Sequence, residues 1–303
     1  MPSALPAIAL PVGLFLAFWT LCFAPLAGLV RLTRASTKRA SAWVAGSRAG
    51  RWSIGHSGPI GSYAPIFLVM VVGAIAAVGA GHLFEELAEQ VRLSTSAVSR
   101  ADQGIHAWFG HERQPAMTGL LRAVTMLGGS AGMGALVALV MTMLLIRKER
   151  ASAIFLVVTT GTGELLNLVL KMIFARTRPD LATALTVAHS FSFPSGHAMG
   201  SFICLGALSY LALRQPWSWV VKSAVLAFGL TTIVLVGLSR VYLGVHWASD
   251  IAGGWSAGVV WLAAAMVAFE MLLGLRQRRR GAAPSSASTD LPDRPVPAQP
   301  AKP

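Results

Sequence analysis

The chain has 303 residues, of which 54% are hydrophobic and only 12% are charged, and its mean hydropathy is +0.62. Because a soluble domain carries about 25% charged residues, this composition excludes an ordinary soluble protein and indicates an integral membrane protein. The net charge of +13 would also suit a nucleic-acid-binding protein. The basic residues, however, stand in short segments between apolar runs, as in the cytoplasmic loops of membrane proteins. We therefore expect a membrane as partner and no nucleic acid.

Seven apolar runs approach or exceed the roughly 20 residues that a membrane-spanning helix needs. They predict an all-α fold, a polytopic transmembrane helix bundle, with spans at 5–30, 60–82, 118–146, 152–174, 197–213, 219–239 and 247–274. The first run has no basic segment before it, and Arg31 and Arg34 follow it, a pattern that favours a retained helix over a cleaved signal peptide. We expect three parts: an N-terminal helix and basic loop (1–58), a core bundle (59–275) and a Pro/Ala/Ser-rich disordered tail (276–303).

The distribution of basic residues predicts the orientation of these spans. One side holds the connections 31–58, 147–151, 214–218 and the tail. These connections are rich in Lys and Arg, with Glu149 as the single acid before the Pro-rich tail, so this side should be cytoplasmic. The outward side then holds the connections 83–117, 175–196 and 239–247. In the first of these, "LFEELAEQV" is expected to be a solvated loop helix rather than an amphipathic helix at the interface.

Three polar segments interrupt the apolar pattern, and all three fall on the outward side. "LKMIFARTRPD" ends the fourth span, "HSFSFPSGHA" opens the fifth, and "SRVYLGVHWASD" joins the sixth and seventh. Charged residues are costly in lipid and usually face a bundle interior or a polar cavity. Three such segments at one depth therefore predict a single polar site.

The first segment offers cations for an anionic ligand. Lys171 and Arg178 are seven residues apart, so they would share a helix face if the helix extends that far. An Arg fork and a Lys point charge together suit a phosphate group. For each cation alone, the alternative is an anchor whose charged end reaches the membrane surface, and we interpret Arg176 in that way.

The second segment predicts a helix start that can bind phosphate. Pro194 sets the entry, Ser195 can cap the first free amides, and Gly196 allows a ligand close to the backbone. Free amides at a helix N-terminus bind phosphate, and His197 would lie beside the bound anion in the first turn. The alternative for His197 is a helix-packing histidine.

The third segment pairs a histidine with an acid. His246 and Asp250 are four residues apart and would share a helix face, so Asp250 can hold one ring nitrogen and leave the other as nucleophile or base. Gly244 permits a turn before them, and Arg240 can point at the same anion. The alternative is a buried polar pair that only fastens two helices.

The ordered set of residues resembles the three-part signature of the type 2 phosphatidic acid phosphatase superfamily. The matching elements are Lys171 with Arg178-Pro179, then Pro194-Ser195-Gly196-His197, then Ser239-Arg240 with His246 and Asp250. The resemblance covers about residues 100–275, and the 60–82 span would complete the six-helix core of membrane members. The helix at 5–30 would be an addition to that core.

The resemblance implies a membrane enzyme that hydrolyses a lipid phosphate or pyrophosphate. The phosphate-binding residues that it implies are Lys171, Arg178, Ser195, Gly196 and Arg240. His246 would attack phosphorus to form a phosphohistidine, Asp250 would orient His246, and His197 would protonate the leaving oxygen. The family uses no metal and no cofactor. Cys22 and Cys204 lie in apolar runs and are expected to be buried thiols, with no disulfide or metal site.

By family precedent, undecaprenyl pyrophosphate is the first expected substrate. Phosphatidylglycerol phosphate, phosphatidate and lipid A phosphate are alternatives, and transfer of phosphate to an acceptor other than water is also open. The expected location is the inner (plasma) membrane, with the active site on its extracytoplasmic side. A non-enzymatic lipid-binding or transport protein is a distant alternative, since a transporter would place its charges near the midplane. No pattern in the sequence indicates the oligomeric state.

Overall fold

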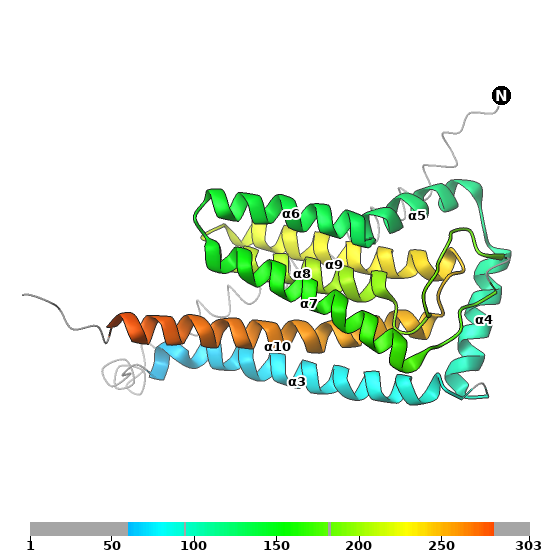
Figure 1. Cartoon of the computed structure of the whole chain (residues 1–303), viewed down its shortest axis with the longest axis horizontal. Helices are drawn as coiled ribbons and strands as arrows, with labels where there is room; N and C mark the ends of the chain where they lie inside the picture. The colour runs from blue at the N-terminus through cyan, green and yellow to red at the C-terminus, as the bar shows by residue number, and fades with distance from the viewer. Residues whose placement is uncertain (1–59, 94, 181–182, 282–303) are drawn as a thin grey trace, which may run out of the picture. The chain divides into compact units, whose positions relative to one another are not determined.

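The computed structural model describes residues 60–93, 95–180 and 183–281, and the described chain is all-helical (Figure 1). Its helices are α3 (Ile60–Gln90), α4 (Ala97–His111), α5 (Pro115–Gly128), α6 (Ser130–Ile146), α7 (Arg150–Phe174), α8 (Gly196–Arg214), α9 (Trp219–Tyr242) and α10 (Ala248–Gly281). The predicted span at 5–30, the basic loop at 31–58 and the tail beyond residue 281 lie outside the described residues. The chain divides into two compact units, Met1–Ala265 and Met266–Pro303, and the site described below lies in the first.

Among the residues that the structure describes, four helices are long and apolar enough to cross a membrane. These are α7, α8, α9 and α10 as far as Arg276, which confirms four predicted spans and the all-α, multi-pass fold. The helices α5 and α6 qualify as a fifth span only as a pair bent by 50°. The prediction of a single continuous helix over 118–146 was therefore wrong. Gly129 is extended, with φ −76° and ψ 166°, and it ends α5 and begins α6, consistent with the low helix propensity of glycine.

Two helices run past their predicted ends. Helix α3 continues to Gln90, so "LFEELAEQ" belongs to it and is not a separate loop helix. The helix runs through Gly79 and Gly81 without a break. This helix is not among those that meet the criterion for a span over the described residues. Helix α10 continues through "RQRRRG" to Gly281. The predicted tail boundary at residue 276 therefore falls inside α10. The helix can continue there because Arg and Gln are good helix formers.

Helix α7 ends earlier than a shared face for its two cations would need. Its last residue is Phe174, and the next residue, Ala175, has a left-handed conformation with φ 43° and ψ 33°. Lys171 is therefore in the last helical turn, while Arg178 lies beyond the helix. The two cations do not share a helix face, and Arg178 reaches the site from the loop.

The bundle core is built around α8, which packs against α7 on one side and α9 on the other. Met199 and Ile203 of α8 are fully buried and contact Ala257 and Trp261 of α10. Large apolar side chains on the outer faces of α7 and α9 stay exposed, for example Leu165 and Phe228. This is the pattern of a bundle whose outer surface meets lipid.

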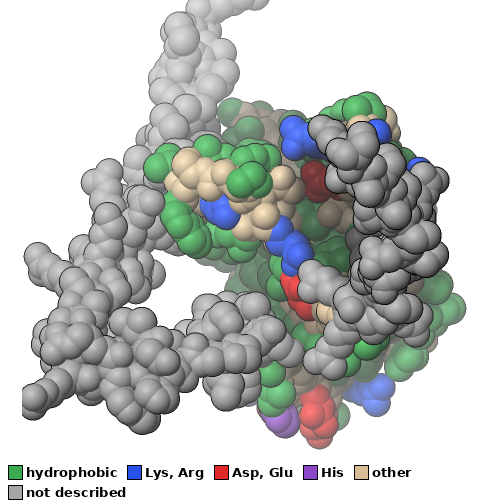
Figure 2. All heavy atoms as spheres, turned by 90° about the vertical axis from the view of Figure 1, so that its left-hand side faces the viewer, with side chains coloured by type: hydrophobic (Ala, Val, Ile, Leu, Met, Phe, Trp, Pro, Cys, Tyr) green, Lys and Arg blue, Asp and Glu red, His purple; other side chains and the backbone are tan. Residues whose placement is uncertain are grey.

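The antiparallel packing brings the predicted polar segments to one end of the bundle. The C-terminal ends of α7 and α9 meet the N-terminal ends of α8 and α10 there, and α4 lies across this end (Figure 1). The connection between α6 and α7 lies at the opposite end, where Arg147, Lys148 and Arg150 are exposed. Figure 2 looks onto that opposite end and shows Lys and Arg side chains among apolar ones.

Close packing of α5 against α9 makes a prediction about stability. A side-chain carbon at Gly128 would lie 2.3 Å from Cγ1 and 3.0 Å from Cβ of Val236, and the branched valine has little freedom to move. We expect Gly128→Ala to destabilise the protein by about 1–3 kcal/mol and to lower its melting temperature in detergent. Gly119→Ala in the same helix is the control, because the space around Gly119 is open among the described residues. An equal melting temperature for both variants would contradict this packing.

Candidate active site

His246 and Asp250 are in contact at the end of the bundle, although His246 lies in the turn before α10 and the two do not share a helix face. Gly244 has a left-handed backbone with φ 76°, which turns the chain between α9 and α10. The Nδ1 atom of His246 lies 3.2 Å from Oδ2 of Asp250. The same oxygen accepts hydrogen bonds from the Ser192 hydroxyl at 2.5 Å and from the Trp247 amide at 2.9 Å. The pair is fully enclosed, because His246 is 2% exposed and Asp250 is 0% exposed.

The ring of His246 carries its proton on the nitrogen that faces Asp250. Nη1 of Arg178 donates to Nε2 of His246 at 3.1 Å. Since a guanidinium can only donate, Nε2 is the acceptor and Nδ1 holds the proton. Burial lowers the pKa of His246 to about 4, although the hydrogen bond and charge of Asp250 raise it. The ring is therefore neutral at pH 7, with a lone pair on Nε2.

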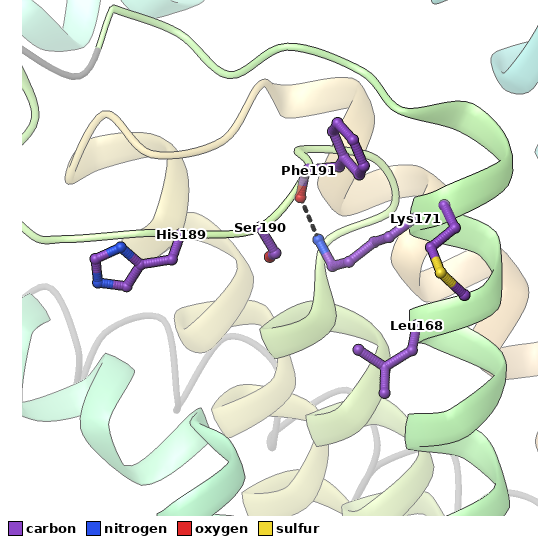
Figure 3. A pocket seen from close by; sticks show the side chains of 6 residues that line it. Leu168, Lys171, His189, Ser190 and Phe191 are labelled. Carbon is purple, nitrogen blue, oxygen red and sulfur yellow. Dashed lines mark hydrogen bonds between the residues drawn. The ribbon is translucent and has the colours of Figure 1, made fainter.

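Hydrogen bonds to backbone carbonyls hold two cations near this histidine. Arg178 donates from Nε to the Ser190 carbonyl at 2.6 Å and from Nη1 to the Val245 carbonyl at 2.5 Å. Lys171 donates from Nζ to the Phe191 carbonyl at 2.5 Å, as Figure 3 shows. The loop that follows α7 thus holds both cations without neutralising either.

Arg240 reaches the same region from the last turn of α9. Its Nη1 donates to the Thr125 hydroxyl of α5 at 2.9 Å, and the residue is 5% exposed. In the described part of the chain, its Nε is buried and has no hydrogen-bond partner. Since a buried donor without a partner is costly, Arg240 is well suited to an anionic ligand. Thr125 was not predicted, because it lies far from the three polar segments in sequence.

The start of α8 has the predicted form. The Ser195 hydroxyl accepts from the Ala198 amide at 3.4 Å, and the Ser195 amide donates to the Asp250 carbonyl at 3.0 Å. Gly196 is needed for close packing, because a side-chain carbon there would lie 3.0 Å from Oδ1 of Asn167. The capped N-terminus of α8 is therefore tied directly to the start of α10.

His197 lies in the first turn of α8, against the break between α5 and α6. A side-chain carbon at Gly129 would be 3.2 Å from Nε2 of His197, so the break leaves room for the ring. The cations of Lys171, Arg178 and Arg240 and the ring of His246 are neighbours of His197. All the predicted site residues are therefore brought together.

Arg176 is not the membrane-surface anchor that its isolated position suggested. It is mostly enclosed, with its side chain 11% exposed, and Nη1 donates to Oδ1 of Asp250 at 2.6 Å. Its Nη2 donates to Oδ2 of Asp102 in α4 at 2.8 Å. Asp102 and Ser192 were missed. Asp102 was identifiable only as the one acid within α4, and Ser192 stood unremarked beside the predicted helix start.

An apolar pocket lies between the end of α7 and residues 189–191, beside Lys171 (Figure 3). Its volume is about 510 Å³, and it is lined by Leu168, Lys171, Met172, His189, Ser190 and Phe191. Leu168 and Met172 are 55% and 66% exposed on the lipid-facing surface of the helix. An apolar surface thus leads directly to a buried cation, an arrangement that suits an amphiphilic ligand.

The described residues contain no group of three or more His, Cys, Asp or Glu side chains arranged to hold a metal ion. Cys204 is a free thiol and is 1% exposed in the bundle core, which confirms its predicted burial. Cys22 lies outside the described residues.

The chain is similar to several known membrane phosphatases. The model of the PAP2 superfamily matches residues 152–273. Phosphatidylglycerophosphatase B of Bacillus subtilis (strain 168) is 34% identical over 169 residues, which cover 55% of this chain and 83% of that protein. Undecaprenyl-diphosphatase of Sulfolobus acidocaldarius is 32% identical over 121 residues, which cover 38% of this chain and 54% of that protein. The solved transmembrane PAP2 type phosphatidylglycerolphosphate phosphatase from Bacillus subtilis has 34% identity and a TM-score of 0.60, covering 65% of this chain and 96% of that one.

The neutral state of His246 predicts how stability depends on pH. Its pKa is about 4 when folded, against 6.5 as the ordinary value, so the unfolded chain binds the proton more readily. The stabilisation is complete above pH 6.5 and is lost as pH falls from 6.5 to about 4, by up to about 1.4 kcal/mol per pH unit. We expect His246→Gln to flatten this slope in melting curves in detergent. His82→Gln, at an exposed position, should keep the slope, and an unchanged slope in His246→Gln would disprove the assignment.

Proposed function

The chain belongs to the PAP2 superfamily, and from this premise we propose that it hydrolyses a lipid phosphate or diphosphate through a phosphohistidine on His246. Its relatives are phosphatases named for lipid phosphates, which supports a phosphatase that acts on such substrates. The observation that carries the proposal is the unprotonated Nε2 of His246, which Arg178 contacts and Asp250 backs. This is a nucleophile held beside cations that suit a phosphate group.

Phosphate binding uses the donors that converge on this nitrogen. Arg178 lies directly against Nε2, Lys171 approaches from α7, and Arg240 has a spare buried donor. The N-terminus of α8, which begins at Gly196, adds first-turn amides that favour an anion. Three cations and these amides offset the charge of a phosphate dianion and the extra charge of its transition state.

Two displacements at phosphorus then complete the reaction. Nε2 of His246 attacks phosphorus, the bond from phosphorus to the leaving oxygen breaks, and protonated His197 donates its proton to that oxygen. The bound dianion favours the protonated form of His197. In the second step, water attacks phosphorus, the bond from phosphorus to nitrogen breaks, and His197 takes a proton from the water. Inorganic phosphate leaves, and both histidines return to their starting states.

The apolar pocket beside Lys171 supports a lipid substrate. Leu168 and Met172 offer an apolar surface for a hydrocarbon tail, and Lys171 lies at the point where the phosphate would follow. Phosphatidylglycerol phosphate is the first candidate, because the relative named for it is matched over 83% of its length. Undecaprenyl diphosphate, the first expectation from the sequence, is the second candidate and has the support of a relative matched over 54% of its length.

The catalytic role of His246 is tested by phosphate release in detergent. We expect wild-type protein to release phosphate from phosphatidylglycerol phosphate or undecaprenyl diphosphate, with equal rates in the presence of EDTA. His246→Ala should reduce the rate by about 10⁴-fold or more, because it removes the nucleophile. His82→Ala is the control and should match wild type. Unchanged release by His246→Ala would refute the phosphohistidine mechanism, and loss of release in EDTA would refute metal independence.

We also propose that the site faces the extracytoplasmic side of the inner membrane. The support is the exposed basic cluster at the α6–α7 connection, at the opposite end of the bundle from the site. In a Cys22→Ser background, a cysteine at the exposed Val187 should react with a membrane-impermeant thiol reagent added to intact cells. A cysteine at Lys148 should react only after the cells are permeabilised. The reverse labelling pattern would place the site in the cytoplasm.

A further inference from the structure

We infer that Asp102 and Arg176 are positioning residues, which hold Asp250 in place and set the basicity of His246. The inference rests on the proposed function, in which His246 is the nucleophile. Neither residue belongs to the phosphate-binding set, and Asp102 lies in α4, outside the 152–273 segment that the family model matches. The helix that lies across the end of the bundle thereby becomes part of the active site.

The geometry divides the two oxygens of Asp250 between two tasks. Oδ1 accepts from Arg176 at 2.6 Å, while Oδ2 accepts from Ser192 and Trp247 and faces His246 at 3.2 Å. With both oxygens engaged, the carboxylate cannot turn without breaking a short hydrogen bond. Arg176 therefore fixes the plane of the carboxylate that orients the nucleophile.

Asp102 in turn fixes Arg176. One carboxylate oxygen of Asp102 accepts from Nη2 of Arg176 at 2.8 Å and from the Ser249 hydroxyl at 2.5 Å. The other oxygen accepts from the Ser249 amide at 2.9 Å, in the first turn of α10, where a negative charge is favourable. The guanidinium also lies over the Trp247 ring, 5.6 Å from its centroid. Asp102 thus joins α4 both to the arginine and to the helix that carries Asp250.

The three charges are buried together, so each affects the others strongly. Asp102 and Asp250 are 3% and 0% exposed, and Arg176 shares its single positive charge between them. Removing Arg176 would leave Asp250 with its full charge beside His246 and favour the protonated ring. Removing the charge of Asp102 would leave the cation undivided on Asp250 and favour the neutral ring. The other charged or titratable groups near this histidine are Lys171, Arg178 and His197, and Arg240 lies beside His197. All four are unchanged in every variant.

The opposite signs of these two effects separate the proposal from a structural role. A pair that only fastens α4 would lower the amount of folded protein when either partner is removed, with no shift in the titration of His246. A positioning pair moves that titration upward in Arg176→Gln and downward in Asp102→Asn. The double variant, which removes one charge of each sign, should return it toward the wild-type value.

The test is NMR titration of histidine-labelled protein in detergent, with the His246 signal assigned by its loss in His246→Gln. We expect the midpoint to rise by about one pH unit or more in Arg176→Gln, to fall in Asp102→Asn and to return in the double variant. Arg176→Lys keeps the charge and should restore the midpoint without restoring full activity. Arg92→Gln, at an exposed position near the pair, is the control and should leave the midpoint unchanged. Midpoints that stay fixed, or that move in the same direction in both single variants, would overturn the inference.

Kinetics on phosphatidylglycerol phosphate provide the second measurement. We expect kcat to fall about 10²-fold in Arg176→Gln through misplacement of the nucleophile, with KM nearly unchanged, because the pair does not bind the phosphate. Equal losses in kcat and binding would contradict a positioning role. If wild-type protein hydrolyses no lipid phosphate while the titration shifts appear, the proposed function fails and the positioning pair stands. If hydrolysis is normal and the shifts are absent, the pair alone is refuted.

Discussion

The buried carboxylate of Asp250 is the interaction on which the site depends. A charge without solvent is tolerated only when donors surround it, and Asp250 receives them from three parts of the chain. Arg176 follows α7, Ser192 precedes α8, and His246 and Trp247 lie in the connection between α9 and α10. The cost of leaving this carboxylate unpaired therefore forces the ends of four helices to meet in one arrangement. The pairing of this carboxylate therefore determines both the geometry of the site and the packing at this end of the bundle.

The rest of the fold serves to keep polar groups at one end and lipid-facing groups elsewhere. Small residues let helices approach closely, as at Gly128 against Val236 and Gly163 against Ile203. The extended backbone at Gly129 bends the α5–α6 pair and leaves space for His197. The lipid-facing surface of α7 continues into an apolar pocket that ends at Lys171. A substrate can thus present a charged head to the site while its tail stays in contact with apolar side chains.

Most of the site was predictable because its residues have fixed local spacing. His246 and Asp250 are only four residues apart, so the start of α10 brings them together even though His246 itself lies in the preceding turn. Ser195 caps the helix that follows it. Arg178 was identified for the wrong reason, since α7 stops at Phe174 and the cation arrives through the loop. Arg176 was misinterpreted because a lone arginine near a helix end looks the same in sequence whether it reaches the membrane surface or an acid 74 residues away.

The sequence by itself determined the fold class, four of the apolar spans and the candidate histidines and cations of the site, because hydropathy and short-range spacing act locally along the chain. Only the tertiary structure decided the bend between α5 and α6 and the partners of Arg176, Arg240 and Asp250. Those outcomes depend on contacts between residues far apart in sequence, such as Asp102 with Arg176 and Thr125 with Arg240. No local pattern encodes such pairs, since they arise when buried charges and donors must satisfy one another inside a packed bundle.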